Sequence, residues 1–425
     1  MSDMTRRGFL KGAAAGAAMA AAGGAMAQPA AKAARPLNVA IIGTGDHGRH
    51  LVTHCMKLPG LRFQAVCDIW DFSRNYAVKL LKKYKHAVTG YVDYRDMLAK
   101  EKSLDAVIVA TPDGFHAAQT IACLEAGANV YCEKEMATNL ADCAKMVAAA
   151  KATGKLLQVG RQHRSNARYQ RALELIDKHG ALGRITHVSG QWHGHKREKM
   201  AWPAKYTIPP AVLAKYGYAS MEQFRNWRFF SKFAAGEIAS LGSHQIDVFN
   251  WFLHTPPSAV YASGGLDYYS EYELYDNISC VYEWNYAAGG RKTLVRGTYE
   301  INNTTELGGF FETFTGTEGE LVISEIASRG GICREIKTPL AEWEKTLPPV
   351  SVAQYGSRAY GPIPATDSKR VYWHHLKNFF EAIRGQAQLA CPPEVGYAAA
   401  VSVFRAIDSM KTGKRIEIKP DEYKA

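Results

Sequence analysis

Short apolar runs alternate with stretches of helical periodicity along the first 160 residues of the chain. The runs lie in the segments RPLNVAII, LRFQAVC, LDAVIVA, NVYC and KLLQV, which begin at residues 35, 61, 104, 129 and 155. Helical patterns such as Phe72–Tyr84 and Ala141–Thr153 separate them. Strands that alternate with helices form βαβ units, so this part of the chain predicts an α/β domain with a doubly wound parallel sheet. We expect this domain to cover residues 36–160.

The hydrophobic pattern in the second part of the chain has a period of two. Apolar and polar positions alternate, as in half-buried strands, through 258–266, 276–287, 292–302, 308–315 and 319–324. We therefore expect a C-terminal α+β domain over 161–418, built on an open, mostly antiparallel sheet.

Helices are expected around this second sheet. Tyr169–Lys178 should link the two domains, and Ser243–Leu253 should form a further helix. The segments 371–384 and 394–411 should form helices that pack back, and the first domain is a candidate for this contact. We expect loops over 194–235 and 326–368.

The N-terminus has the pattern of an export signal. Arg6 and Arg7 precede a Gly- and Ala-rich stretch, and Ala25-Met26-Ala27 supplies a cleavage site. The stretch is too weakly apolar for a stable membrane anchor, which needs roughly 20 strongly apolar residues. It resembles a twin-arginine signal peptide over residues 1–27. We therefore expect the twin-arginine export machinery as a partner and a periplasmic or otherwise exported mature protein.

Composition and charge exclude some classes of partner. Hydrophobic residues make up 47% and charged residues 22% of the chain, as in ordinary globular proteins. The formal net charge is +12. Because residues 1–27 contribute three positive charges and one negative charge, the processed chain keeps about +10, with no obvious basic block. Nucleic acid is not expected as a partner.

A glycine-rich turn follows the first apolar run. Gly43-Thr44-Gly45-Asp46-His47-Gly48 has the spacing GxGxxG between a predicted strand and a predicted helix, and Asp68 follows twenty residues later, at the end of the next strand. This context is the dinucleotide fingerprint, in which the glycines and the helix N-terminus receive the pyrophosphate. Asp68 should bind the ribose 2′-hydroxyl and repel a 2′-phosphate, so we expect NAD in preference to NADP. The alternative is a glycine-rich turn without a ligand.

Two further candidates follow the third apolar run. Ligands of such sheets bind at the carboxyl ends of the strands. Thr111 and His116 are therefore candidate neighbours of the cofactor. Helix capping by Thr111 or Asp113 is the alternative.

The fourth apolar run ends in Glu133, Lys134 and Glu135. By itself this stretch is most simply a solvated turn. Together with the fingerprint, the export signal and the mixed second domain, CEKEMA resembles the Glu-Lys-Pro motif of the Gfo/Idh/MocA family. The segments ATPDGFH, GRQHRSNARY, GEIASLGSHQID and FTGTEGELVIS resemble other parts of that family. The resemblance covers about 36–418.

The resemblance implies an NAD-dependent oxidoreductase that acts on a sugar or sugar derivative. Glu133 and Lys134 would lie at the cofactor, Lys134 would also touch the substrate hydroxyl, and His244 would accept its proton. This chemistry is reasonable, because a histidine with a pKa of ~6.5 suits proton transfer and a lysine stabilises a developing alkoxide. A histidine in such a helix is otherwise a core or capping residue.

Further substrate contacts follow from the same resemblance. Asp247 would bind a sugar hydroxyl, and Arg164 and Asn166 would lie near the cofactor or substrate. Trp227, in the aromatic loop 194–235, is a candidate for stacking on a sugar ring, although it may equally pack the loop. His193 and His195 alternate, but no further ligand set appears, so no metal is expected.

Two positions depart from the family pattern. Glu135 replaces the proline after the lysine, and Ser240 replaces the aspartate four residues before His244. The second change removes an expected partner of Lys134 or His244. Glu237 lies seven residues before His244 and is a candidate replacement on the same helix face.

Export constrains the function further. A soluble NAD pool is not expected outside the cytoplasm, so the cofactor should be tightly bound and regenerated in place. Coupled oxidation and reduction of two carbohydrates would do this. One alternative is an NAD-dependent glycoside-cleaving enzyme that uses transient oxidation, and another is a non-catalytic, NAD-containing carbohydrate-binding protein. A homo-oligomer is expected by analogy with the family.

Overall fold

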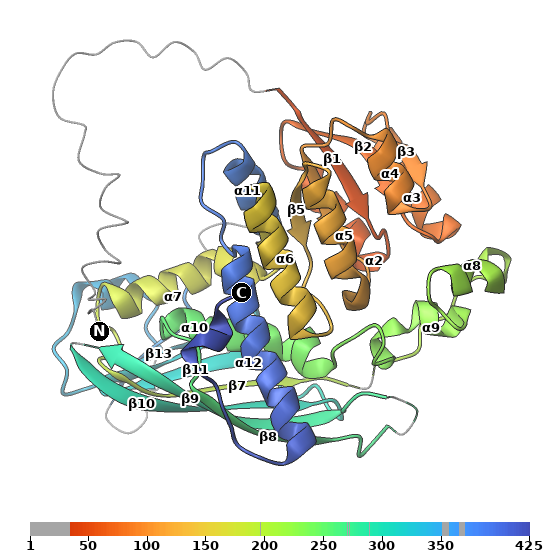
Figure 1. The fold of residues 1–425 in the computed structure, drawn as a ribbon. Coiled ribbons are helices and arrows are strands. Elements are labelled where there is room, and N and C mark those ends of the chain that lie inside the picture. The colour runs from red at the N-terminus through yellow and green to blue at the C-terminus, as the bar shows by residue number, and fades with distance from the viewer. Residues whose placement is uncertain are drawn as a thin grey trace, which may run out of the picture. The chain divides into compact units, whose positions relative to one another are not determined.

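The apolar runs of the first 160 residues form a six-stranded parallel sheet (Figure 1). We analysed a computed structural model that describes residues 35–195, 197–269, 271, 273–288, 290–350, 357–364 and 370–425; the expected signal peptide lies outside these residues. The strand order is β3-β2-β1-β4-β5-β6, in agreement with the predicted doubly wound sheet. The strands are β1 (Leu37–Ile42), β2 (Leu61–Cys67), β3 (Thr89–Tyr91), β4 (Ala106–Val109), β5 (Asn129–Cys132) and β6 (Leu157–Val159).

Buried residues lie on both faces of this sheet, which explains why its strands are almost continuously apolar. Val39 and Ile41 of β1 face a core shared with Leu51 of α2, whereas Ala40 and Ile42 face the core that includes α5 and α6. The helices are α2 (Asp46–Cys55), α3 (Asp71–Lys83), α4 (Tyr94–Lys100), α5 (Asp113–Glu125) and α6 (Leu140–Thr153). The short edge strand β3 and the helix α4 were not predicted, because β3 has only three residues and no buried one.

A nine-stranded, mostly antiparallel sheet follows, in the order β14-β13-β12-β11-β7-β10-β9-β8-β15. One pair, β7 and β10, is parallel. The strands are β7 (Ile185–His193), β8 (Ala259–Gly265), β9 (Asn277–Ala288), β10 (Arg291–Asn302), β11 (Phe310–Gly316), β12 (Gly319–Ile323), β13 (Gly331–Glu335), β14 (Ser357–Tyr360) and β15 (Ile416–Glu417). The predicted open antiparallel sheet is confirmed.

The two segments expected to be loops contain regular structure. β13 and β14 lie within 326–368, at the edge of the second sheet. The segment 194–235 contains α8 (Pro210–Lys215), α9 (Met221–Arg225) and the 3-10 turns η2 (Ala204–Tyr206) and η3 (Trp227–Phe229). These pieces are too short to give a clear periodicity, which is why the sequence did not predict them.

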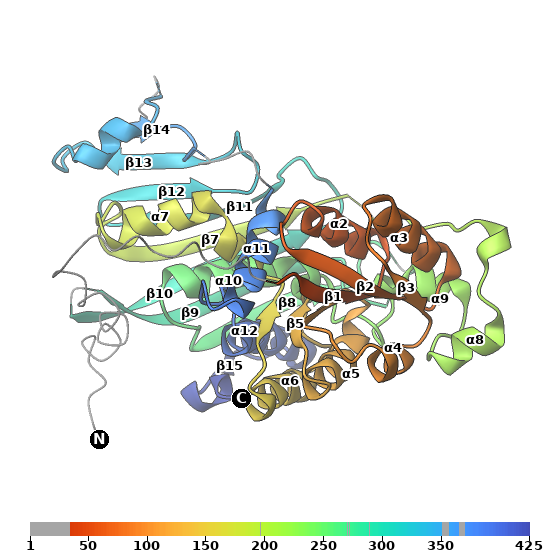
Figure 2. The ribbon, with the colours of Figure 1, turned by 90° about the horizontal axis from the view of Figure 1, so that it is seen from above.

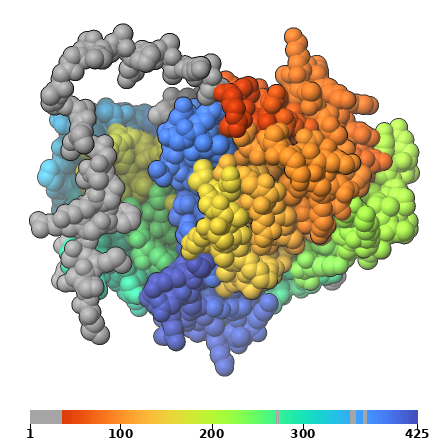
Figure 3. All heavy atoms as spheres, turned by 45° about the horizontal axis from the view of Figure 1, so that its top comes forward, coloured from red at the N-terminus to blue at the C-terminus, as the bar shows by residue number. Residues whose placement is uncertain are grey.

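The remaining helices join the two sheets. They are α7 (Ala167–Asp177), α10 (Ser243–Phe252), α11 (Val371–Ile383) and α12 (Pro393–Thr412). As expected, α11 packs on α2, and α12 packs on α6 and β6. Figure 2 shows α12 alongside α6, and Figure 3 shows the blue surface of the C-terminal helices in contact with the yellow surface of α6. No helix in the described part of the chain is both long and apolar enough to cross a membrane.

A buried ion pair links the end of β5 to the start of α10. One guanidinium nitrogen of Arg161 donates to both carboxylate oxygens of Glu135, at 3.0 and 2.9 Å, and another donates to the carbonyl of Ser243 at 2.9 Å. The two side chains are 1% and 0% exposed. The resemblance implies a proline at position 135, and this chain instead fixes the turn with a buried charge pair.

Glu135→Ala is expected to lower the free energy of unfolding by about 3–5 kcal/mol, because it leaves the Arg161 guanidinium buried without its counter-ion. Urea denaturation followed by circular dichroism measures the loss. Glu342→Ala is the matched control, since Glu342 pairs with Lys345 at 2.7 Å and is 87% exposed, and an exposed pair contributes ~0–1 kcal/mol. Equal losses in the two variants would contradict a structural role of the buried pair.

Candidate active site

The strand order of the first sheet reverses between β1 and β4, which is the point at which open α/β sheets bind their ligands. Gly43 directly follows β1 and Glu133 directly follows β5, whereas Thr111 lies two residues beyond the end of β4. The predicted cofactor residues therefore lie at one edge of the sheet.

The three glycines of the fingerprint have different surroundings. Gly43 has a φ of +89°, and a Cβ added there would lie 2.6 Å from the Ala110 carbonyl oxygen. A Cβ on Gly48 would lie 2.0 Å from the Gly43 carbonyl oxygen, so Gly48 permits close packing of helix and turn. A Cβ on Gly45 would meet nothing within 4 Å. The open space above Gly45, at the N-terminus of α2, fits a dinucleotide pyrophosphate.

Asp68 is fixed at the end of β2, where a ribose-binding carboxylate belongs. One oxygen accepts from the backbone N–H of Thr44 at 2.7 Å, and the other accepts from the N–H of Trp70 at 2.8 Å. Burial raises the pKa of Asp68, while these hydrogen bonds oppose the rise. The Thr44 hydroxyl donates a second hydrogen bond to Oδ2 at 3.1 Å, so it is Oδ1 that keeps acceptor capacity for a ribose hydroxyl. The residues present thus fit NAD.

Glu133 is held as a buried carboxylate beside the fingerprint. Nε2 of His47 lies 3.0 Å from Oε1 of Glu133, and the Tyr131 hydroxyl donates to the same oxygen at 3.2 Å. Burial alone would raise the pKa of Glu133, but His47 and Lys134 lower it to about 2. His47 and Glu133 therefore connect α2 directly to the Lys134 turn. Asp46 instead pairs with Arg49 on the outer side of α2.

His116 links two turns at this edge. Its Nδ1 lies 2.7 Å from the carbonyl oxygen of Glu135, and its Nε2 lies 2.7 Å from that of Thr111. Burial opposes protonation, but Cys132, Asp113 and the Glu135 carbonyl raise the pKa of His116 to about 10. A doubly protonated ring can donate to both carbonyls. The Thr111 hydroxyl donates to Gln119 at 2.6 Å, and α5 has no side-chain cap among the described residues.

Lys134 reaches across to the second part of the chain. Its ammonium donates to the carbonyl oxygen of Ser240, in the π-helical turn η4 (Ile238–Gly242) that runs into α10. The peptide bond between Lys134 and Glu135 is cis. Burial lowers the pKa of Lys134, and Glu133 and Asp113 oppose that effect. Position 240, which lacks the family's carboxylate, thus still contacts Lys134 through its backbone.

His244 lies four residues further, in the first turn of α10. It is 5% exposed, and its Nδ1 is buried without a hydrogen-bond partner among the described residues. Burial lowers the pKa of His244 well below its usual value, and Lys134, His163 and Arg161 lower it further. The ring is therefore neutral at pH 7 and able to accept a proton. The ordinary pKa expected from sequence does not apply.

Sequence reasoning missed His163. Its ring centroid lies 5.1 Å from that of His244 and 4.9 Å from that of Tyr169, on which it stacks. Its Nε2 lies 3.0 Å from Oε1 of Glu325. Burial lowers the pKa of His163, but Glu325 outweighs this and raises it. Nothing in GRQHRSNARY distinguishes this histidine; only the fold places it beside His244.

Glu237 does not take the place suggested from sequence. It pairs with Arg197 at 3.4 Å and lines a separate pocket, so it is not the partner of His244. The prediction that Glu237 replaces the missing aspartate is therefore wrong.

The predicted substrate residues are spread over four elements. Arg164 donates to both oxygens of Asp247 at 2.8 Å, and the two form a largely buried bidentate pair between η1 (Gln162–Ser165) and α10. The Asn166 side chain caps α7 through the N–H of Arg168. Trp227 is half-buried in η3, and the Arg228 guanidinium lies over its ring at 4.2 Å.

Two histidines singled out in the sequence lie away from this site. His193 pairs with Glu300 at 2.6 Å, and His195 pairs with Glu306 at 3.0 Å. Among the described residues, no group of three or more His, Cys, Asp or Glu side chains could hold a metal ion.

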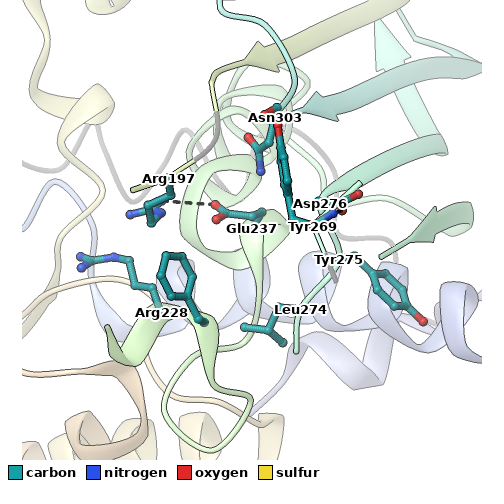
Figure 4. Close-up of a pocket in the computed structure, with 9 residues that line it drawn as sticks. Arg197, Arg228, Glu237, Tyr269, Leu274, Tyr275, Asp276 and Asn303 are labelled. Carbon is teal, nitrogen blue, oxygen red and sulfur yellow. Dashed lines mark hydrogen bonds and ion pairs between the residues drawn. The ribbon is translucent and has the colours of Figure 1, made fainter. Parts of the chain in front are cut away.

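A pocket lies beside the turn that carries Ser240. Arg197 and Glu237 pair across it, and Asn303 and Asp276 contribute from the second sheet and its loops (Figure 4). Its full lining is Arg197, Arg228, Phe229, Glu237, Tyr269, Leu274, Tyr275, Asp276 and Asn303. Aromatic rings combined with polar side chains suit the faces and hydroxyls of a sugar.

Comparison with known proteins is consistent with this geometry. Residues 37–161 match the GFO_IDH_MocA oxidoreductase family with its NAD-binding Rossmann fold, and residues 169–322 match the GFO/IDH/MocA C-terminal domain. Residues 3–23 match the twin-arginine translocation signal sequence, which suggests export by that pathway.

Similar proteins include dehydrogenases and a glycosidase. An inositol 2-dehydrogenase/D-chiro-inositol 3-dehydrogenase of Shouchella clausii is 36% identical over 147 residues, 33% of this chain and 40% of that protein. A glycosyl hydrolase family 109 protein of Stenotrophomonas maltophilia is 31% identical over 198 residues, 44% of this chain and 42% of that protein. The chain thus spans half or less of the length of these curated relatives.

A solved structure shows the same fold over a greater length. The aldose-aldose oxidoreductase of Caulobacter crescentus has a TM-score of 0.69, with 90% of this chain and 100% of that chain covered, at 18% identity. Because both parts of the chain match the family, this protein is a member of the Gfo/Idh/MocA oxidoreductase family, with an NAD-binding Rossmann fold.

Proposed function

We propose that the protein is an NAD-dependent oxidoreductase that acts on a CH–OH group of a sugar or sugar derivative. The observation that carries this function is the meeting of two groups at the edge of the cofactor crevice. The Lys134 ammonium is anchored on η4, and the neutral ring of His244 follows in the same helical stretch. A cation and a neutral base side by side suit the oxidation of a hydroxyl.

Each side chain at the site has its own proposed role in binding or proton transfer. When bound, NAD supplies a hydride acceptor for the carbinol carbon. Gly45 and the N-terminus of α2 hold the pyrophosphate, and Asp68 holds the adenosine ribose. Lys134 stabilises the developing alkoxide, and His244 takes the hydroxyl proton. Because Nδ1 of His244 is buried, we assign proton acceptance to its Nε2.

His163 takes over part of the role of the missing aspartate. It lies beside His244 and pairs with Glu325, whose side chain is 24% exposed. His163 lowers the pKa of His244 and so favours the neutral form that can accept a proton. The pair of Arg164 and Asp247 holds the first turn of α10 in position and offers its remaining acceptor capacity to a sugar hydroxyl. Asn166 and Trp227 stay proposed substrate contacts.

NAD is retained through export and recycled in place. An apolar cluster supports retention: Trp70, directly beyond Asp68 and Ile69, is buried with Ile208, Leu213 and Phe233 of the segment 204–233. The indole N–H of Trp70 donates to the Tyr206 carbonyl at 2.6 Å. This segment therefore covers the adenosine end of the crevice and would slow exchange. The mature protein is periplasmic or otherwise exported.

A homo-oligomer is proposed on a different face. Tyr261, Val281 and Leu294 are 47%, 41% and 41% exposed on the neighbouring strands β8, β9 and β10. Tyr261 and Val281 are directly opposite each other, whereas Leu294 lies further along β10, opposite Asn285. Exposed apolar side chains on one face of a sheet suit a subunit interface.

Glycoside cleavage by transient oxidation is the second candidate, and the similarity to a glycosyl hydrolase family 109 protein favours it. A non-catalytic, NAD-containing carbohydrate-binding protein is the third, favoured by Ser240. The two oxidoreductive routes differ in their net products, and the third gives none.

Protein isolated from the exported fraction without added cofactor should release about one NAD per chain when denatured, as measured by mass spectrometry. Gly45→Val should release almost none, because its side chain would occupy the pyrophosphate space. A Cβ at position 45 meets no protein atom within 4 Å and the residue has a φ of −58°, so the circular dichroism of the variant should be unchanged. An empty parent protein would contradict a retained cofactor.

Reduction of the bound cofactor by sugar should keep its rate as the pH falls from ~8 through the usual histidine pKa of ~6.5, because the pKa of His244 lies well below that value and the ring stays neutral. The rate should fall only in more acidic solution. His244→Asn should reduce it by roughly 10²–10⁴-fold while NAD stays bound. Stopped-flow absorbance of reduced nicotinamide gives both results; an undiminished rate in His244→Asn would exclude His244 as the base.

Mixing an oxidisable and a reducible sugar with the NAD-loaded protein should give equal amounts of one oxidised and one reduced product, detected by mass spectrometry. The reason is that a retained cofactor must return its hydride to a second carbohydrate. Cleavage of a glycoside with neither product would assign the second candidate function. Lack of turnover by the parent protein in both assays would favour the third.

A further inference from the structure

One cationic side chain in the pocket beside Ser240 has carboxylates nearby but forms no ion pair with them among the described residues: Asp113, Glu237 and Glu133 act on Arg228 through electrostatics alone. The half-buried Arg228 guanidinium lies over the face of the Trp227 ring at 4.2 Å. Within the described ranges it makes no hydrogen bond or ion pair. Arginine presents five N–H donors in a planar fork that matches a carboxylate or another oxyanion.

The other charges of the pocket are already balanced. Arg197 pairs with Glu237 at 3.4 Å. The Asp276 carboxylate accepts from the backbone N–H groups of Asp267, Tyr268 and Tyr269, at 3.2, 2.8 and 2.9 Å. Figure 4 shows Arg228 on the same side of the pocket as Arg197, away from Asp276. The two arginines and two carboxylates of the lining balance in formal charge, so Arg228 stands out because its N–H donors are not engaged within the described residues, whereas Arg197, Glu237 and Asp276 all have hydrogen-bonding partners.

Arg228 also lies within electrostatic reach of the proposed reaction centre. After burial, which has the largest effect, Arg228 is among the charges that lower the pKa of Lys134. The pocket and Lys134 share the turn η4, since Glu237 directly precedes η4 and Ser240 in η4 accepts from Lys134. A substrate whose hydroxyl lies at Lys134 would extend into the pocket.

We infer that the substrate is an anionic carbohydrate, and that Arg228 binds its negatively charged group. This inference rests on the proposed function and specifies its substrate class. The charged group is an oxyanion attached to the sugar, either the carboxylate of a sugar acid or a sulfate ester. The positive net charge of the protein, +12 for the full chain, favours encounter with such ligands.

The test compares matched neutral and anionic sugars on the NAD-loaded protein. The probes are D-glucose, D-glucuronate and D-glucose 6-sulfate, together with D-galactose and D-galacturonate. Binding is followed by tryptophan fluorescence, because Trp227 lies against Arg228. We expect at least one anionic sugar to bind ~10-fold or more tightly than its neutral partner, as a charge-assisted hydrogen bond allows. A preference for glucuronate or galacturonate assigns a carboxylate, and a preference for the 6-sulfate assigns a sulfate ester.

Arg228→Gln should abolish this preference, so that the anionic sugar binds no more tightly than its neutral partner. Arg228→Lys should keep part of it, because it keeps the charge but loses the planar fork. Arg95→Gln is the matched control, since Arg95 is 69% exposed and its nearest acidic partner is Asp93 at 3.6 Å; it should behave like the parent.

Two results would overturn the inference. One is equal or undetectable binding of all the anionic probes relative to their neutral partners. The other is loss of NAD from Arg228→Gln, which would make Arg228 a cofactor residue. Failure of the proposed function gives a different result: the parent protein would show the preference for anionic sugars but would not reduce bound NAD with any of them.

Discussion

The buried ion pair between Glu135 and Arg161 holds together the two halves of the proposed active site. The Glu135 carboxylate fixes the turn after β5 by pairing with the Arg161 guanidinium. The same guanidinium fixes the first turn of α10 by donating to the Ser243 carbonyl. Lys134 and His244 are the immediate neighbours of these two contact points. A charge pair that is almost fully buried tolerates little change in geometry, because either ion alone would be strongly destabilised. The relative position of Lys134 and His244 therefore follows from a contact that neither of them makes.

The same edge of the sheet combines charges that compensate one another. Glu133 remains a carboxylate because His47 and Lys134 outweigh its burial, and His116 remains charged between two carbonyl groups. His244, surrounded by Lys134, His163 and Arg161, is driven to the neutral form. The acid–base character of each group thus depends on its neighbours more than on its own type. Perturbed groups that meet in a crevice are typical of functional sites.

The sequence predicted the part of this arrangement that local patterns encode. Apolar runs buried on both faces of a sheet, the glycine spacing before α2 and the acidic residue after β2 are local, and all three lie where they were expected. The roles of Lys134 and His244 were predicted only through a family resemblance, and they stay proposals. His163, the bidentate pair of Arg164 with Asp247, and the Glu237–Arg197 pair depend on contacts between residues far apart in the chain. The hydrophobic periodicity of the sequence does not indicate such contacts, which is why Glu237 was assigned to the wrong partner.

The central claim is that a substrate hydroxyl lies between Lys134 and His244. A crystal structure of the NAD-loaded protein in complex with a sugar measures this directly. The account predicts one carbinol oxygen within hydrogen-bonding distance, about 2.6–3.2 Å, of both Nζ of Lys134 and Nε2 of His244. A sugar bound in the crevice with no hydroxyl near either group would contradict it.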